Sequence, residues 1–322
     1  MAKHAKSVME ANGVAHIVTV IQGAVEEIEL PIEADGLVAN DGDEPTQVVD
    51  IIISEWMGYF LLRESMLDSL IRARDKFMRP KTGLMFPSHT TMYFAPIQDE
   101  EERKMSSQEY SNAMNDWFEF AEGTKSTYGV DMKVLESEFD REQKEYYILS
   151  SRWSELPSEA VLADPAMVKH LDMVTCTIED SRGISSTSKE AHFEFRVDGN
   201  VTCGPISGFA GWFTADFMSR TDPIGKDAAP KISHPAFLST GPENGYTHWG
   251  QQTFYLPSPI PLFCNQLTKV VGNIEMMRTK ANARLYNCRI THTASRVQLE
   301  DDGKEGPVLN KGAEVSQVYQ IP

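Results

Sequence analysis

The stretch that decides the fold is residues 48–66, which read VVDIIISEWMGYFLLRESM. Its first half holds a near-continuous apolar run around Ile51, Ile52 and Ile53, which is typical of a strand buried on both faces in a parallel sheet covered by helices. The run stops at Ser54, so we expect Glu55 at the carboxyl end of a central strand. In open α/β sheets, this edge is where ligands bind.

A second glutamate, Glu64, follows Glu55 in the same stretch. The residues between them are almost all apolar, Arg63 being the charged exception, and Gly58 permits a tight turn. A loop this apolar does not usually face water freely. We therefore predict a hairpin that folds back and holds two carboxylates in a dry slot with aromatic walls.

Two carboxylates in a dry slot repel each other unless a cation lies between them. A guanidinium presents five donors in a fixed planar fork and suits bidentate pairing with carboxylates, so an arginine side chain fits the slot. Acid/base work on a glycosidic bond also needs two carboxylates. An ordinary hairpin, with one glutamate capping the next helix, is the third interpretation, and these residues alone leave the three open.

The whole chain has the composition of a globular protein, with 322 residues, enough for about two domains, and 41% hydrophobic residues. Its apolar runs are shorter than a membrane span, and its first residues lack a secretory pattern. The formal net charge of −17 disfavours direct binding to nucleic acid and favours basic partners. The four cysteines lack metal-binding spacing and are interpreted as reduced thiols of a cytoplasmic and nuclear protein, without a metal site.

The N-terminal part, residues 1–87, is predicted to be one domain. We expect a helix over residues 1–13, a strand at residues 17–21 and a loop at residues 23–27, which contains Val25 and Glu26. Residues 34–46 are rich in acidic residues, Gly and Pro, and predict a surface loop. Apolar residues at helical spacing predict a helix over residues 67–78, and residues 84–86 predict a short strand.

The second predicted domain is residues 88–322, because the pattern after Pro87 changes to many short strands separated by turns. Such a pattern favours a sandwich or a barrel. The predicted strands are residues 91–94, 145–149, 173–178, 192–197, 209–217, 253–256, 270–276, 283–293 and 315–321.

An amphipathic segment at about residues 98–131 interrupts this strand pattern. It begins with a run of charges and then carries large apolar residues, among them Trp117 and Phe118. An apolar stripe on a projecting helix needs a cover. The segment either docks on another subunit or folds back on its own barrel.

The strings SEWMGY at residues 54–59 and ESML at residues 64–67 resemble the double-glutamate loop of protein arginine methyltransferases. The string YTHW at residues 246–249 resembles the second signature of that family, its Thr-His-Trp loop, and the two motifs stand in the family's order. The similarity runs along almost the whole chain and is strongest to the plant and algal branch of the type I enzymes.

This resemblance implies an α/β plus β fold: a partial doubly wound, Rossmann-like methyltransferase domain followed by a β-barrel with an inserted helical dimerisation arm. It implies S-adenosylmethionine as the cofactor, with Val25 and Glu26 at the adenine. It also implies a homodimer through the arm, and protein substrates such as histones and RNA-binding proteins, converted to asymmetric dimethylarginine.

The resemblance also implies roles for the motif residues. Glu55 and Glu64 are expected to hold the substrate guanidinium, and His248 to belong to the path of proton release. Met57, Tyr59, Met66 and Trp249 are expected to line the acceptor slot and the reacting centre. Without the resemblance, Glu26 is better interpreted as part of a solvated acidic turn, and His248 with Trp249 as residues of a barrel edge.

The family's glycine-rich cofactor turn, and the acidic residue that binds the ribose, are not found before the strand at residues 48–54. We therefore expect a chain truncated at its front end, with one sheet edge exposed and without catalytic activity in this form. The alternative is a non-catalytic partner that regulates a complete arginine methyltransferase.

Overall fold

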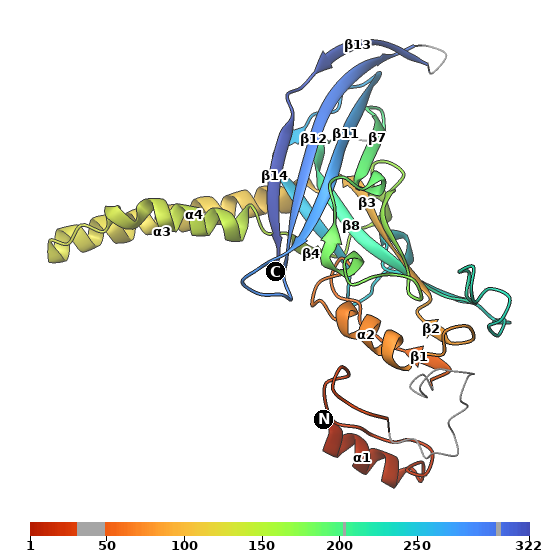
Figure 1. Cartoon of the computed structure of the whole chain (residues 1–322). Helices are drawn as coiled ribbons and strands as arrows, with labels where there is room; N and C mark the ends of the chain where they lie inside the picture. Colours follow the sequence, from red (N-terminus) through yellow and green to blue (C-terminus); the bar gives the residue numbers. More distant parts are fainter. Residues whose placement is uncertain (31–48, 202–203, 301–303) are drawn as a thin grey trace.

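The computed structural model describes residues 1–30, 49–201, 204–300 and 304–322. The surface loop predicted at residues 34–46, and Val48 at the start of the predicted strand, lie outside the described residues. Figure 1 shows three parts: a small N-terminal α/β region, a larger body of strands, and a long helical arm that projects from this body.

The N-terminal region contains helix α1 (Ala2–Ala11), strand β1 (Ile51–Ile53), helix α2 (Leu67–Phe77) and strand β2 (Leu84–Phe86). β1 and β2 pair in parallel, with Ile52 opposite Met85, and form a two-stranded sheet. The predicted burial of β1 on both faces is wrong, since Ile51 and Ile53 are 49% and 78% exposed. β2 is its one partner strand among the described residues.

The predicted strand at residues 17–21 is also wrong, because these residues form turns and extended chain. Ile17 and Val18 are exposed. β-Branched residues favour a strand only where another strand pairs with them and a face is buried. The described residues provide neither here.

The body of strands consists of two open sheets of six strands each. In the first, β4 (Arg152–Ser154), β10 (Gln251–Ile260), β8 (Ile206–Phe217), β3 (His89–Ile97) and β5 (Ala166–Asp172) follow one another, and β9 (Ala236–Ser239) pairs with β8. The second has the order β13 (Glu305–Lys311), β12 (Tyr286–Leu299), β11 (Gln266–Arg278) and β6 (Gly183–Ile184), with β14 (Val315–Ile321) on β12 and β7 (His192–Asp198) on β11.

Aromatic rings join the two sheets. Phe94 of β3 lies 5.0 Å from Phe209 of β8 and 5.4 Å from Phe193 of β7, measured between ring centroids. Phe254 of β10 extends the cluster, 6.2 Å from Phe94. All of these side chains are buried, so the period-two alternation of the strands gives the sheets a common core.

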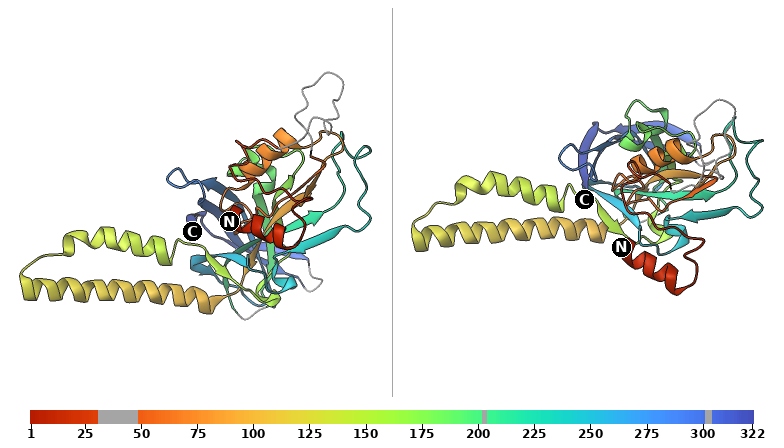
Figure 2. Two further views of the ribbon diagram at one scale, coloured as in Figure 1. Left: turned by 90° about the horizontal axis from the view of Figure 1, so that it is seen from below. Right: turned by 60° about the horizontal axis from the view of Figure 1, so that its bottom comes forward.

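The arm is a helical hairpin made of α3 (Glu100–Tyr128), a short 3₁₀ turn (Lys133–Leu135) and α4 (Glu136–Tyr147). Figure 2 shows the two helices side by side, extending away from the strands. Trp117 stacks on Phe139 of α4 at 4.6 Å, so this side chain packs within the arm and not on the barrel. Phe118 is 42% exposed. The arm thus extends beyond residue 131, and the strand predicted at residues 145–149 is wrong because it falls mostly on α4.

The strand predicted at residues 173–178 is wrong as well. The Asp172 carboxylate accepts a hydrogen bond from the Val174 backbone, and the Asp172 carbonyl accepts one from Cys176. This turn ends β5 and prevents a further strand. Among the residues described, no helix is both long and apolar enough to cross a membrane.

Candidate active site

The double-glutamate loop is folded onto the strands by its own apolar residues. The Gly58 backbone donates to the Leu61 carbonyl at 2.9 Å, and a Cβ at Gly58 would lie 1.9 Å from the Arg63 carbonyl oxygen, so only glycine fits. Phe60 and Leu61 have positive φ angles of 45° and 64° and are buried. The Phe60 ring meets Phe254 edge-on at 5.9 Å. Core packing therefore holds this strained turn in place.

Glu64 is held by the β11–β12 hairpin of the second sheet. It has a φ of 82°, its backbone N–H donates to the Arg284 carbonyl at 2.8 Å, and its carboxylate accepts from Arg284 Nη2 at 2.7 Å. Arg63 Nη1 lies 3.4 Å from the other carboxylate oxygen. Sequence reasoning missed Arg284, because it lies 220 residues from Glu64 and no local pattern marks it.

Helix α2 fixes the loop on its other side. Its first turn carries Asp68, whose carboxylate accepts two hydrogen bonds from the Arg278 guanidinium, at 2.7 and 2.8 Å. These bonds hold the pKa of Asp68 below its ordinary value. Ser65 adds a hydrogen bond of 3.1 Å to the Tyr286 hydroxyl. The chain around Glu64 is therefore tied to both β11 and β12.

The predicted dry slot differs from what is found. Glu55, two residues after β1, is exposed, and the Glu64 side chain is 34% exposed. The loop buries its apolar side chains, including Trp56 and Met57, in the core. The carboxylates of Glu55 and Glu64 therefore face solvent. Tyr59 is half-buried with the Arg63 guanidinium 5.3 Å from its ring centroid. Met66 is 50% exposed.

The Thr-His-Trp loop meets the double-glutamate loop directly. The Trp249 indole donates from Nε1 to the Met57 carbonyl at 2.8 Å, across 192 residues of sequence. Its ring contacts Phe213 edge-on at 5.5 Å. His248 is exposed, with its ring 3.8 Å from that of Trp249, and its carbonyl accepts from Trp153 Nε1 at 3.3 Å. The structure therefore brings the two predicted motifs together.

Glu26 lies against α2. Ser69 donates to Glu26 Oε1 at 2.6 Å, and this hydrogen bond is the main reason why the pKa of Glu26 lies below its ordinary value. Lys76 donates to the Glu26 and Ile28 carbonyls at 3.3 and 2.6 Å. Val25 is half-buried. The pair thus offers an ionised acceptor beside an apolar edge, which fits the amino group and ring of an adenine.

The family model described as the arginine methyltransferase oligomerization subdomain matches residues 88–296. The chain belongs to the protein arginine methyltransferase family. Protein arginine N-methyltransferase PRMT10 of Oryza sativa subsp. japonica is 38% identical over 312 residues, covering 96% of this chain and 72% of that protein. The PRMT10 of Arabidopsis thaliana is 38% identical over 296 residues, covering 90% of this chain and 68% of that protein.

Solved structures agree with this assignment. The crystal structure of Arabidopsis thaliana protein arginine methyltransferase 10 aligns with a TM-score of 0.78 at 33% identity, over 100% of this chain and 80% of that chain. The Trypanosoma brucei PRMT1 enzyme–prozyme complex shares the fold, with a TM-score of 0.61 at 23% identity over 100% of this chain and 78% of that one. The predicted fold class is confirmed, with open sheets in the β-barrel part.

By family, this arginine methyltransferase is an enzyme that uses S-adenosylmethionine as its cofactor. The described residues fit one edge of that cofactor, the adenine, through Val25 and Glu26. They contain no group of His, Cys, Asp and Glu side chains that could hold a metal ion.

Proposed function

We propose that the protein transfers methyl groups to guanidino nitrogens of arginines in basic protein tails, with Glu64 and Glu55 as the acceptor carboxylates. The observation that carries the proposal is the Glu64–Arg284 pair at 2.7 Å. It places a guanidinium of the chain itself on the carboxylate that resembles the family's substrate-binding glutamate. A carboxylate that binds this group in one arginine can bind it in another.

The residues around the Glu64–Arg284 pair then have distinct roles in the proposed reaction. S-adenosylmethionine, when bound, supplies the methyl group on a sulfonium. Glu64 and Glu55 hold the substrate guanidinium and draw its positive charge away from one terminal nitrogen, so that this nitrogen faces the donor. His248 takes part in releasing the proton, and Trp249 and Tyr59 wall the arginine channel. Met57 and Met66 border the reacting centre.

The product, substrates and assembly form part of the proposal. Motif residues 56–59 and 247–249 resemble type I members, so the product is asymmetric dimethylarginine. The net charge of −17 favours arginine-rich substrates such as the tails of histones and RNA-binding proteins. The exposed apolar residues of the arm, such as Phe120, support a homodimer. Cytoplasm and nucleus are the compartments that fit such substrates.

The 322 residues by themselves should bind S-adenosylmethionine weakly and turn over below detection, because they contain no Gly-x-Gly turn to cradle the cofactor's amino-acid end. Calorimetric titration of the chain with S-adenosylmethionine measures the affinity, and mass spectrometry of a glycine- and arginine-rich peptide measures the transfer. A dissociation constant in the micromolar range would contradict this prediction, because Val25 and Glu26 would then be sufficient to bind the cofactor.

A second candidate function is that of a non-catalytic partner which regulates a complete arginine methyltransferase. Its motivating observation is the same Glu64–Arg284 pair, because a substrate guanidinium would have to displace Arg284 from Glu64. The two candidates differ in what happens when this cation is removed.

For the enzyme, Arg284→Ala should strengthen the binding of a labelled arginine-rich peptide roughly 2–5-fold, the range expected for the loss of one exposed ion pair. Fluorescence anisotropy measures this, with Arg182→Ala as the control, since Arg182 is also exposed and paired with a glutamate, Glu179. Unchanged peptide binding in Arg284→Ala would favour the non-catalytic partner.

A further inference from the structure

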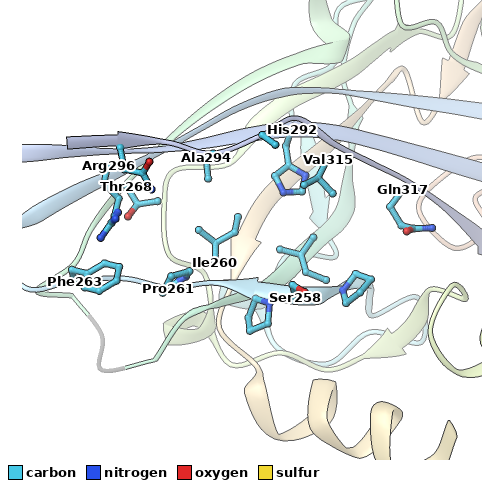
Figure 3. A pocket seen from close by; sticks show the side chains of 16 residues that line it. Ser258, Ile260, Pro261, Phe263, Thr268, His292, Ala294, Arg296, Val315 and Gln317 are labelled. Carbon is cyan, nitrogen blue, oxygen red and sulfur yellow. The ribbon is translucent and has the colours of Figure 1, made fainter. Parts of the chain in front are cut away.

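A cavity of about 540 Å³ lies between the two sheets, away from the double-glutamate loop. One wall of the cavity consists of the end of β10 and the residues that follow it, up to Phe263. The opposite wall consists of residues of β11, β12 and the start of β14. Figure 3 shows side chains from both walls pointing into the space between them. The volume lies in the range of small-molecule sites.

The sequence explains why the sheets separate here. Pro257, Pro259 and Pro261 cannot donate backbone hydrogen bonds, and the pairing of β10 with β8 is interrupted between Tyr255 and Ile260. Across the gap, Ala294 has a small side chain on the facing wall. Strand β10 therefore leaves its sheet at a point where the facing wall carries only a small side chain, and a hollow remains between the two sheets.

Two buried polar atoms at this hollow have no partner. His292 is 5% exposed, and its Nδ1 makes no hydrogen bond among the described residues. Thr268 is 1% exposed, and its Oγ1 is likewise unpaired. A buried polar group without a hydrogen-bond partner is unfavourable, so a ligand with a hydrogen-bonding group would relieve this cost. Burial lowers the pKa of His292, which favours a neutral imidazole at pH 7.

The guanidinium of Arg296 adds a cation to the polar groups at the hollow. His292, Ala294 and Arg296 alternate along β12 and so face the same side of the strand, with Thr268 paired opposite Arg296. The Arg296 guanidinium lies 4.5 Å from the centroid of the Phe263 ring, and both side chains line the cavity. None of the ion pairs found within the described ranges involves Arg296.

The hollow is separate from the acceptor site. Tyr286, at the start of β12, is hydrogen-bonded to Ser65 of the double-glutamate loop. His292 and Arg296 lie six and ten residues further along the same strand, which corresponds to roughly 20–33 Å. A ligand in the hollow would therefore not overlap a substrate arginine at Glu64.

We propose that this hollow binds a small carboxylic acid with an aromatic or branched apolar body. The carboxylate would pair with Arg296 and accept a hydrogen bond from the Thr268 hydroxyl. The apolar body would lie between Ile260, Phe263 and the prolines. The inference stands on its own and does not need the proposed methyl transfer.

The experiment is saturation-transfer NMR and calorimetry of the full chain with 3-phenylpropionate, and with 3-phenylpropionamide as a ligand of the same shape without the charge. We expect saturable binding of the acid at millimolar concentration or below, and at least tenfold weaker binding of the amide. Arg296→Gln should weaken the acid at least tenfold. Ala294→Leu, which fills the hollow, should abolish binding of both compounds.

Arg289→Gln is the matched control, because Arg289 lies on the same strand but at an odd-numbered position, facing the other side, where it pairs with Glu275. It should leave the binding unchanged. Circular dichroism shows whether each variant is folded, and Arg296→Gln keeps the test valid should Ala294→Leu unfold. Equal binding of acid and amide, equal effects of Arg296→Gln and Arg289→Gln, or no saturable binding would each overturn the proposal.

Discussion

Asp222→Ala should lower the free energy of unfolding by about 3–5 kcal/mol, the range for removing one partner of a buried ion pair. The side chains of Arg220 and Asp222 are 3% and 2% exposed, and the guanidinium donates to both carboxylate oxygens at 2.6 and 2.8 Å. Arg220 also donates to the Pro80 and Gly83 carbonyls at 2.7 and 3.2 Å. The variant would leave a buried cation unpaired where the N-terminal region joins the strands.

Urea denaturation followed by tryptophan fluorescence measures the change. Glu194→Ala is the control, because Glu194 forms an exposed pair with Arg196 and should cost less than about 1 kcal/mol. A similar loss of stability in the two variants would show that the buried pair does not join the two parts as argued.

The same pair predicts a dependence on pH. The hydrogen bond from Arg220 lowers the pKa of Asp222 in the folded protein, so the folded state keeps this carboxylate ionised at lower pH than the unfolded state does. The contribution is therefore complete above the unfolded pKa of about 4 and is lost as the pH falls through the folded pKa. Between pH 5 and 3, the urea midpoint of the unsubstituted chain should fall more steeply than that of Asp222→Asn.

Glu55→Gln should reduce turnover by about 10²–10³-fold, the usual effect of removing one group that stabilises charge in the transition state. The amide keeps the shape of the side chain but loses the negative charge that draws the positive charge of the guanidinium. The affinity for S-adenosylmethionine should change little, because the residues proposed to meet the adenine are Val25 and Glu26, not Glu55. The comparison requires a preparation in which the unsubstituted protein transfers methyl groups.

Glu159→Gln serves as the control for this substitution, since Glu159 is an exposed glutamate on the 3₁₀ turn at residues 158–160. Turnover should be unaffected in that variant. If Glu55→Gln retained full turnover, Glu55 would not be one of the two acceptor carboxylates.

Strands with a regular alternation and a paired partner could be predicted from the sequence. The predicted strands at residues 84–86 and 315–321 match β2 and β14 in their limits, and residues 192–197 fall within β7. The failures have different causes. Residues 17–21 have the composition of a strand without a partner. Residues 145–147 form the end of helix α4, which is held by ion pairs such as Lys144 with Asp140.

The motifs of the candidate site could be predicted from the sequence, but the solvent exposure of their side chains could not. Glu55, Glu64, His248 and Trp249 were identifiable from short strings, and the Trp249–Met57 bond brings the two motifs together. Whether a carboxylate faces solvent depends on which side of the loop packs on distant strands. Arg284 could not be predicted, because a pairing across 220 residues leaves no local signal.

The bond between Trp249 and Met57 has a consequence for synthesis on the ribosome. The residues that meet in this bond are 192 positions apart, and translation at about 5–20 residues per second separates their emergence by roughly 10–40 s. During that interval the nascent chain displays its first loop without the second. Chains that terminate before Trp249 is made would therefore lack this bond, and nothing would hold the double-glutamate loop to the Thr-His-Trp loop.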